Sequence, residues 1–330
     1  MTSVVVRRLL SLLPLLLFVS IGVFAMSLQL DPDRAARVRA GGADLTSFEA
    51  LDQVREELRL DDPVAVRYLH WVGDVSHLDL GQSLVNVESR DTDDGVELGG
   101  RSVSALLWER LPRTISIAVV GLFFALLLGV PAGLIGGLRP GTLYDRLGLG
   151  AASLGLAIPS FWVAMLLVLS FSINRSWFPA VGYSPASEGV WEWFRHLIIP
   201  GLALSLPIAA TLARFLRASL VDVLGSPYIR TAWAKGGGTA HVVARHALRN
   251  AAAAPLTVMG IQVAQLFSGA VVIEELFGIE GVGGLVVSAV RSNDVTVLQG
   301  VVVFFVLVTV GINLLVDVLH AYLNPKVQAL

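Results

Sequence analysis

Cysteine is absent from the 330 residues, and the chain has only two lysines, Lys235 and Lys326. The absence of cysteine excludes a disulfide framework, thiolate metal sites and a cysteine nucleophile. Neither lysine stands in the GxxxxGK[ST] pattern of a phosphate-binding loop, because Gly236 follows the first and Val327 the second. The patterns HExxH and GxSxG are missing as well. We therefore expect no catalytic centre, no cofactor site and no ATPase site in this chain.

The histidines are also too dispersed to predict a metal site. Of the six, His241 and His246 come closest in the basic part of the chain. Residues five apart do not share a face of an α-helix, whereas the usual pair of metal-binding histidines is spaced by four. We expect solvated loop histidines and no metal.

Charged residues make up only 15% of the chain, hydrophobic residues make up 55%, and the mean hydropathy is +0.71. Several apolar runs are long enough to cross a bilayer, which predicts an all-α membrane protein with six transmembrane helices. We place them at Leu9–Leu30, Ile115–Leu138, Leu147–Ile173, Leu197–Leu216, Ala251–Ile273 and Val295–Leu319. A cleaved signal peptide is the alternative for the first run, but the run is longer than a signal core and favours a retained helix.

Arginine and lysine gather at the N-terminus, in alternate loops and at the C-terminal tail, so both termini are expected in the cytoplasm. The domains then are residues 1–30, the first transmembrane helix; residues 31–112, an extracytoplasmic loop and cap; and residues 113–325, a core of five helices. Helical spacing of apolar residues predicts a small helical cap within the second of these. The acidic stretch Asn86–Gly100 lacks periodicity and is expected to be a loop.

Two patterns inside the predicted spans leave alternatives open. Gly129, Gly133 and Gly137 form a doubled GxxxG, which favours close helix packing either within the chain or with another subunit. Gln262 and Gln265 lie three apart on one helix. They are suited equally to lining a transport pathway and to hydrogen bonding between helices.

The stretch from Tyr228 to Asn250, YIRTAWAKGGGTAHVVARHALRN, is basic and contains no acid. It predicts a helix over Ser226–Ala234, a break at the three glycines and a second helix with Thr239 as N-cap. Two broad classes fit six spans without an energy source: half of a transport pathway driven by a separate motor, or a membrane scaffold. A compact helix pair on the cytoplasmic side favours the first class, because a motor must push on something rigid.

The same stretch, extended to Pro255, resembles the cytoplasmic EAA loop of ABC-importer permeases, in the version of the dipeptide/oligopeptide/nickel permeases. The Glu-Ala-Ala of that family falls on Arg230-Thr231-Ala232, so its first position departs here, and the glycine falls on Gly236. EELFGIEGVGG (Glu274–Gly284) and NLLVDVLHAYLNPKV (Asn313–Val327) resemble two further signatures of the family.

The resemblance implies a type I ABC importer permease fold in a bacterial inner membrane, with the coupling loop at residues 226–250. It implies a second homologous permease, two cytoplasmic ATPases that bind ATP and Mg²⁺, and an extracytoplasmic substrate-binding protein as partners, besides membrane lipids; nucleic acid is not among them. The expected substrate is a di- or oligopeptide, with nickel or another small solute as the alternative and a scaffold as a distant third. The ATPase-coupling residues would be Arg230, Thr231, Ala232, Lys235, Gly236, His246 and Arg249.

Overall fold

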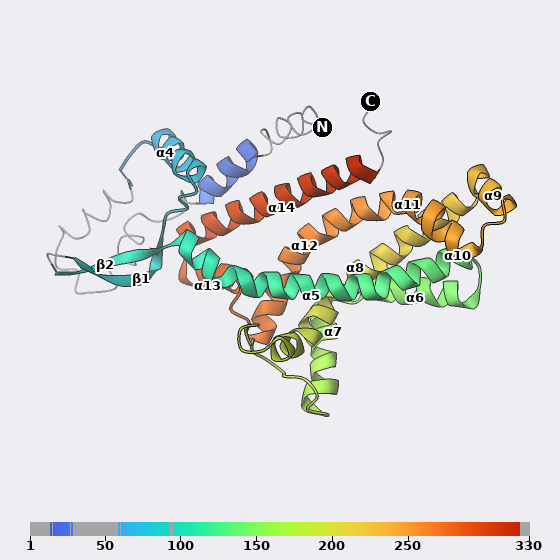
Figure 1. Cartoon of the computed structure of the whole chain (residues 1–330). Coiled ribbons are helices and arrows are strands. Elements are labelled where there is room, and N and C mark those ends of the chain that lie inside the picture. Colours follow the sequence, from blue (N-terminus) through green and yellow to red (C-terminus); the bar gives the residue numbers. More distant parts are fainter. Residues whose placement is uncertain are drawn as a thin grey trace. The chain divides into compact units, whose positions relative to one another are not determined.

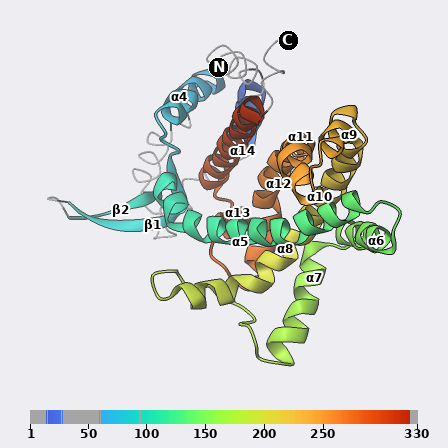
Figure 2. The same ribbon diagram turned by 45° about the vertical axis from the view of Figure 1, so that its right-hand side comes forward.

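The computed structural model describes residues 14, 16–26, 28, 59, 61–92 and 95–323, without the side chains of residues 87–92, 95–99, 317 and 319–323. It is mostly helical (Figures 1 and 2). The chain divides into two compact units. One consists of Met1–Pro112 and Gly284–Val308, the other of Arg113–Gly283 and Thr309–Leu330.

Within the part of the chain that the structure describes, four helices are long and apolar enough to cross a membrane: α5 (Val103–Leu138), α8 (Val190–Leu224), α12 (Ala253–Phe277) and α14 (Val295–Leu323). They correspond to four of the six predicted spans. The first predicted span, Leu9–Leu30, lies partly outside the described residues, and its described part is a short apolar helix at Leu16–Met26. The count of six and the orientation of the termini stay predictions.

The predicted span Leu147–Ile173 is not one straight helix, and it counts as a single span only if its two bent parts are taken together. It divides into α6 (Leu143–Ala157) and α7 (Ser160–Leu167), the latter continued by the π-helical segment η1 (Val168–Ile173), with a bend of 102° between the two parts. The cause is Pro159, because a proline disfavours helical geometry in the residue before it. Ile158 accordingly has an extended backbone, with ψ at 126°.

The doubled GxxxG of α5 packs against α8 within the same chain. A Cβ added at Gly129 would lie 2.8 Å from the carbonyl oxygen of Ala209, and one added at Gly137 would lie 2.8 Å from a methyl carbon of Leu220. Gly133 between them is equally close to α8. The glycines thus let two backbones approach, which is the intramolecular alternative. α8 is the central helix of its unit, and 67% of its most apolar 18-residue segment is buried.

Short elements complete the chain. They are α4 (Val64–Ser76), α9 (Pro227–Ala234), α10 (Thr239–Val242), the π-helical turn η2 (Val243–Ala247), α11 (Leu248–Ala251) and α13 (Val282–Ser292). The helix α4 lies in the segment for which a helical cap was expected; residues 31–58 of that segment are outside the described residues, and the cap stays a prediction.

The described residues of the stretch Asn86–Gly100 (86–92 and 95–100) are not a loop but belong to two antiparallel strands, β1 (Gln82–Thr92) and β2 (Gly95–Ser102), which also departs from the all-α expectation. Its sequence does not alternate between apolar and polar residues. That alternation appears only where one face of a sheet is buried, and a two-stranded ribbon need not bury a face. The missing periodicity was therefore no argument against strands.

One buried carboxylate ties the start of this hairpin to the start of α14. Asp294 accepts hydrogen bonds from the Ser83 hydroxyl at 2.5 Å and from the backbone N–H groups of Leu84 and Val85 at 3.1 and 3.3 Å. Its other oxygen accepts the N–H of Val297, 3.2 Å away, and so satisfies a donor in the first turn of α14.

Candidate functional site

The basic loop between α8 and α12 is a folded element with its own apolar core. Ile229 of α9 and Val242 of α10 are completely buried, and they pack with Leu220 of α8 and with Ala247 and Ala251. The loop is therefore fixed to the last turns of α8 by side-chain packing. This confirms the expected helix pair, and the role of the pair in docking stays a prediction.

The turn after α9 has a complete Schellman motif. Gly236 adopts a positive φ of 85°, and its N–H donates to the carbonyl of Trp233 at 2.9 Å. The N–H of Gly237 reaches back to the carbonyl of Ala232 at 3.4 Å. Both bonds satisfy carbonyls that the end of a helix leaves unpaired. The left-handed backbone expected at Gly236 is confirmed, and a Cβ added there would meet nothing within 4 Å.

The second glycine is needed for a different reason, which sequence reasoning missed. A Cβ added at Gly237 would lie 2.8 Å from a methyl carbon of Val242 and 3.0 Å from the carbonyl oxygen of Ala232. Gly237 therefore allows α9 and α10 to pack closely. Gly238 has an ordinary φ of −66° and open space around it. A run of three glycines hides these three different roles, and only the contacts separate them.

The second helix differs from the expectation in two details. Gly238, not Thr239, is its N-cap, because the extended backbone of the cap falls at Gly238 (ψ 152°) and Thr239 is already helical. The rings of His241 and His246 also lie together, with centroids 6.0 Å apart. The α-helical spacing argument failed because η2 is π-helical, and hydrogen bonds from i to i+5 bring residues five apart onto one face.

The surface of the loop is cationic and aromatic. Of the predicted coupling residues, Ala232 is half-buried, and six are exposed: Arg230, Thr231, Lys235, Gly236, His246 and Arg249. Tyr228 and Trp233 add exposed aromatic area. Arginine, tyrosine and tryptophan are the residues enriched at the energetic centres of protein interfaces. This surface is suited to docking a partner, and Ala232 instead contributes its carbonyl to the turn.

On α12 the two predicted pathway residues are not equivalent, since Gln265 is exposed and Gln262 is half-buried. The exposed positions recur every three or four residues and so lie along one face of the helix. They are Ala254, Thr257, Ile261, Gln265, Ser268, Val272 and Glu275. This face mixes polar and apolar side chains, which a wholly lipid-facing surface would not need.

The glycine-rich segment after α12 closes around a buried glutamate. Glu274 is completely buried, and the hydroxyl of Thr114 donates to its carboxylate at 2.6 Å. The same hydroxyl oxygen accepts the backbone N–H of Val282 at 2.8 Å. A Cβ added at Gly281 would overlap the carboxylate, and one at Gly283 would approach it to 2.8 Å. In the motif Glu274–Gly284, Gly281 and Gly283 therefore lack a side chain at the positions where a Cβ would collide with the buried carboxylate of Glu274.

An ion pair that the sequence did not reveal holds α6 to α8. Asp145 is buried, and Arg217 donates two hydrogen bonds to its carboxylate, from Nε at 2.5 Å and from Nη2 at 2.7 Å. The N–H of Gly141 adds a third at 2.8 Å. The paired geometry satisfies a charge that would be costly to bury alone. The one available signal was an acid between two arginines, Arg139 and Arg146, and the structure places that acid in the first turn of α6.

The comparisons with known proteins agree over the whole chain. The family described as "Binding-protein-dependent transport system inner membrane component" matches residues 129–329, and the N-terminal family of the same systems matches residues 1–118. A putative peptide transport system permease protein of Brucella abortus is 35% identical over 328 residues, 99% of both chains. The glutathione transport system permease protein GsiC of Escherichia coli K12 is 35% identical over the same share. Among solved structures, a chain of the MetNI methionine ABC transporter has a TM-score of 0.54 at 16% identity and covers 67% of this chain and 97% of its own.

Proposed function

The chain belongs to the family of binding-protein-dependent transport system inner membrane components, and from this premise we propose that it is the permease subunit of an ATP-driven importer of dipeptides or oligopeptides. Relatives named for peptide transport, in Brucella abortus and Sinorhizobium fredii, and for glutathione, itself a short peptide, support this substrate class over nickel.

The folded basic loop carries the proposal. It joins the C-terminal end of α8 to the start of α12, so a displacement of α9 and α10 would move both helices. Its apolar core would transmit that displacement without local unfolding. Two cytoplasmic ATPases would dock on this loop and on that of a second, homologous permease. ATP and Mg²⁺ would bind to those ATPases, consistent with the absence of a phosphate-binding loop here.

The exposed face of α12 supports a place for the pathway. Gln265, with Thr257 and Ser268, would offer hydrogen-bonding groups to the peptide backbone, and the intervening apolar residues would tolerate varied side chains. The second permease would complete the pathway, and an extracytoplasmic binding protein would deliver the peptide. Gln262, at the edge of the face, would orient Gln265 or contact a neighbouring helix.

Deletion of the gene tests the transport assignment. We expect uptake of labelled di- and tripeptides to fall to background and nickel uptake to stay unchanged, with recovery of peptide uptake from a plasmid copy. Unchanged peptide uptake together with lost nickel uptake would reverse the substrate assignment. The affinity-purified permease should carry ATPase subunits with it, and it should hydrolyse no ATP once they are removed.

A further inference from the structure

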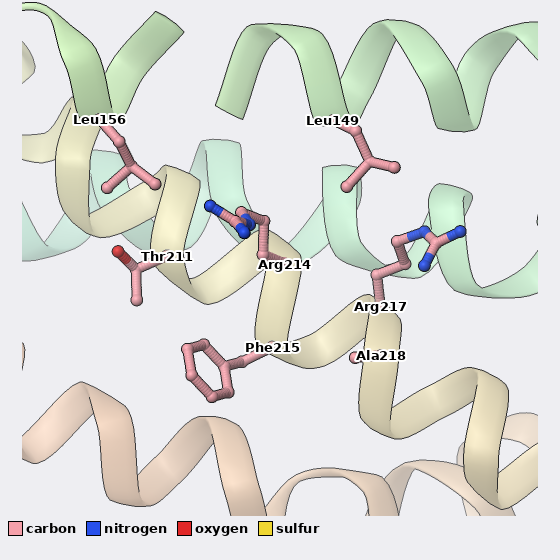
Figure 3. A pocket seen from close by; sticks show the side chains of 7 residues that line it. All are labelled: Leu149, Leu156, Thr211, Arg214, Phe215, Arg217 and Ala218. Carbon is pink, nitrogen blue, oxygen red and sulfur yellow. The ribbon is translucent and has the colours of Figure 1, made fainter. Parts of the chain in front are cut away.

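A groove of about 500 Å³ runs between α6 and α8, beside the basic loop but separate from it. Figure 3 shows its lining from the two helices. The lining residues are Leu149 and Leu156 of α6, and Thr211, Arg214, Phe215, Arg217 and Ala218 of α8. The volume lies within the range of sites that hold small organic ligands.

The groove carries one uncompensated positive charge. The guanidinium of Arg217 forms an ion pair with the carboxylate of Asp145. Arg214 makes no hydrogen bond or ion pair with any residue that the structure describes. Its side chain points from α8 toward the space between Leu149 and Leu156 (Figure 3). Arg214 is exposed, so its guanidinium is accessible to an anion from outside the chain.

The remaining lining is mainly apolar and open on one side. Leu156 and Phe215 are 42% and 44% exposed, so their apolar surfaces are accessible from outside the chain. Arg214 lies two residues before the end of the predicted span Leu197–Leu216, near the cytoplasmic side. An arginine at this depth can lay its apolar stem along the helix and hold its charge at the level of the headgroups.

We propose that this groove binds an anionic phospholipid. The phosphate accepts two hydrogen bonds from the guanidinium of Arg214, and an acyl chain lies along Leu149, Leu156 and Phe215. Arginine suits this role because its planar fork matches phosphate geometry, and basic pockets between membrane helices are known sites for anionic headgroups. A free phosphate ion would satisfy Arg214 but would leave the apolar walls in water, so the charge and the walls together favour a lipid.

The test uses the complete transporter purified in detergent and supplied with phosphatidylglycerol or phosphatidylcholine. We measure the phosphatidylglycerol that remains bound after washing and the thermal unfolding temperature. In the wild type, phosphatidylglycerol is retained and raises that temperature, and phosphatidylcholine does neither. In Arg214→Gln, retention falls roughly fivefold, as expected for loss of one cationic contact.

Three further variants keep the test sharp. Arg146→Gln removes the same charge from an exposed position of α6 outside the groove and retains the lipid. Arg214→Lys keeps the charge and recovers most of the retention. Ala218→Phe leaves the charge in place but fills the groove, and it loses the lipid. The last two variants decide the matter if Arg214→Gln does not assemble.

Each contrary outcome overturns the proposal. Equal protection by inorganic phosphate would show a site for a free anion. An equal loss in Arg146→Gln would show a general attraction of charge to the membrane. If Arg214→Gln releases the second permease but retains phosphatidylglycerol, the groove is a contact between subunits.

Discussion

Gly236→Asp tests whether the turn after α9 contacts an ATPase. Within this chain the substitution meets only one obstacle, the positive φ of 85°, because nothing lies within 4 Å of an added Cβ. A side chain in the left-handed region costs about 1–2 kcal/mol, and aspartate and asparagine tolerate that region better than most residues. The local penalty is therefore small, and we expect a near-normal amount of permease in the membrane.

A docked partner changes the outcome. If the turn packs against an ATPase, the new side chain would clash with the surface of that ATPase. Its negative charge would also reduce the positive charge that the loop presents to the partner. We expect Gly236→Asp to abolish peptide uptake and to reduce co-purification of the ATPase. Gly236→Asn has the same shape without the charge and separates the two effects.

Gly238→Ala is the positional control, since Gly238 has an ordinary φ and open surroundings. We expect it to transport at nearly the wild-type rate. Uptake at the wild-type rate by Gly236→Asp would refute the reasoning, because the loop would then be a connector only.

Three other predictions follow from the contacts and the charge distribution. Gly237→Ala forces a Cβ against Val242 and should destabilise the loop by about 1–3 kcal/mol, seen as faster proteolysis of the loop; protection equal to wild type would contradict the close packing. Gly281→Ala, which crowds the Glu274 carboxylate, should lower the melting temperature of the permease, and an unchanged value would show that the segment rearranges freely. In intact cells, a membrane-impermeant thiol reagent should label a cysteine placed at Thr92 and miss one at Thr239, and the reverse pattern would invert the orientation.

The long apolar helices and the turn after α9 could be predicted because their causes are local. A run of apolar residues is itself the signal for a span, and a glycine after a short helix signals a left-handed end. The break at Pro159 had a local cause too, but it was missed because the span was predicted from the mean hydropathy of the whole run, which a single proline hardly changes. The pairing of His241 with His246 was missed because their sequence spacing was judged on α-helical geometry, and a π-helical turn changes that geometry.

Contacts between distant segments could not be predicted in the same way. Asp145 and Arg217 are 72 residues apart, and nothing near either residue reveals the other. The glycines of α5 predicted a close contact with another helix, but they did not indicate which helix it would be. The groove at Arg214 likewise exists only because α6 packs against α8, and the two helices are distant in the sequence. From the sequence alone, the positive charge of Arg214 indicated only the orientation of the chain in the membrane.

The carboxylate of Asp294 has a consequence for the order in which this part of the chain opens. Its two oxygens hold the N–H groups of Leu84 and Val85 at the start of β1 and the N–H of Val297 at the start of α14. Moving the carboxylate itself would leave donors in both elements without this acceptor. We therefore expect the hairpin base and the first turn of α14 to show similar protection from hydrogen exchange.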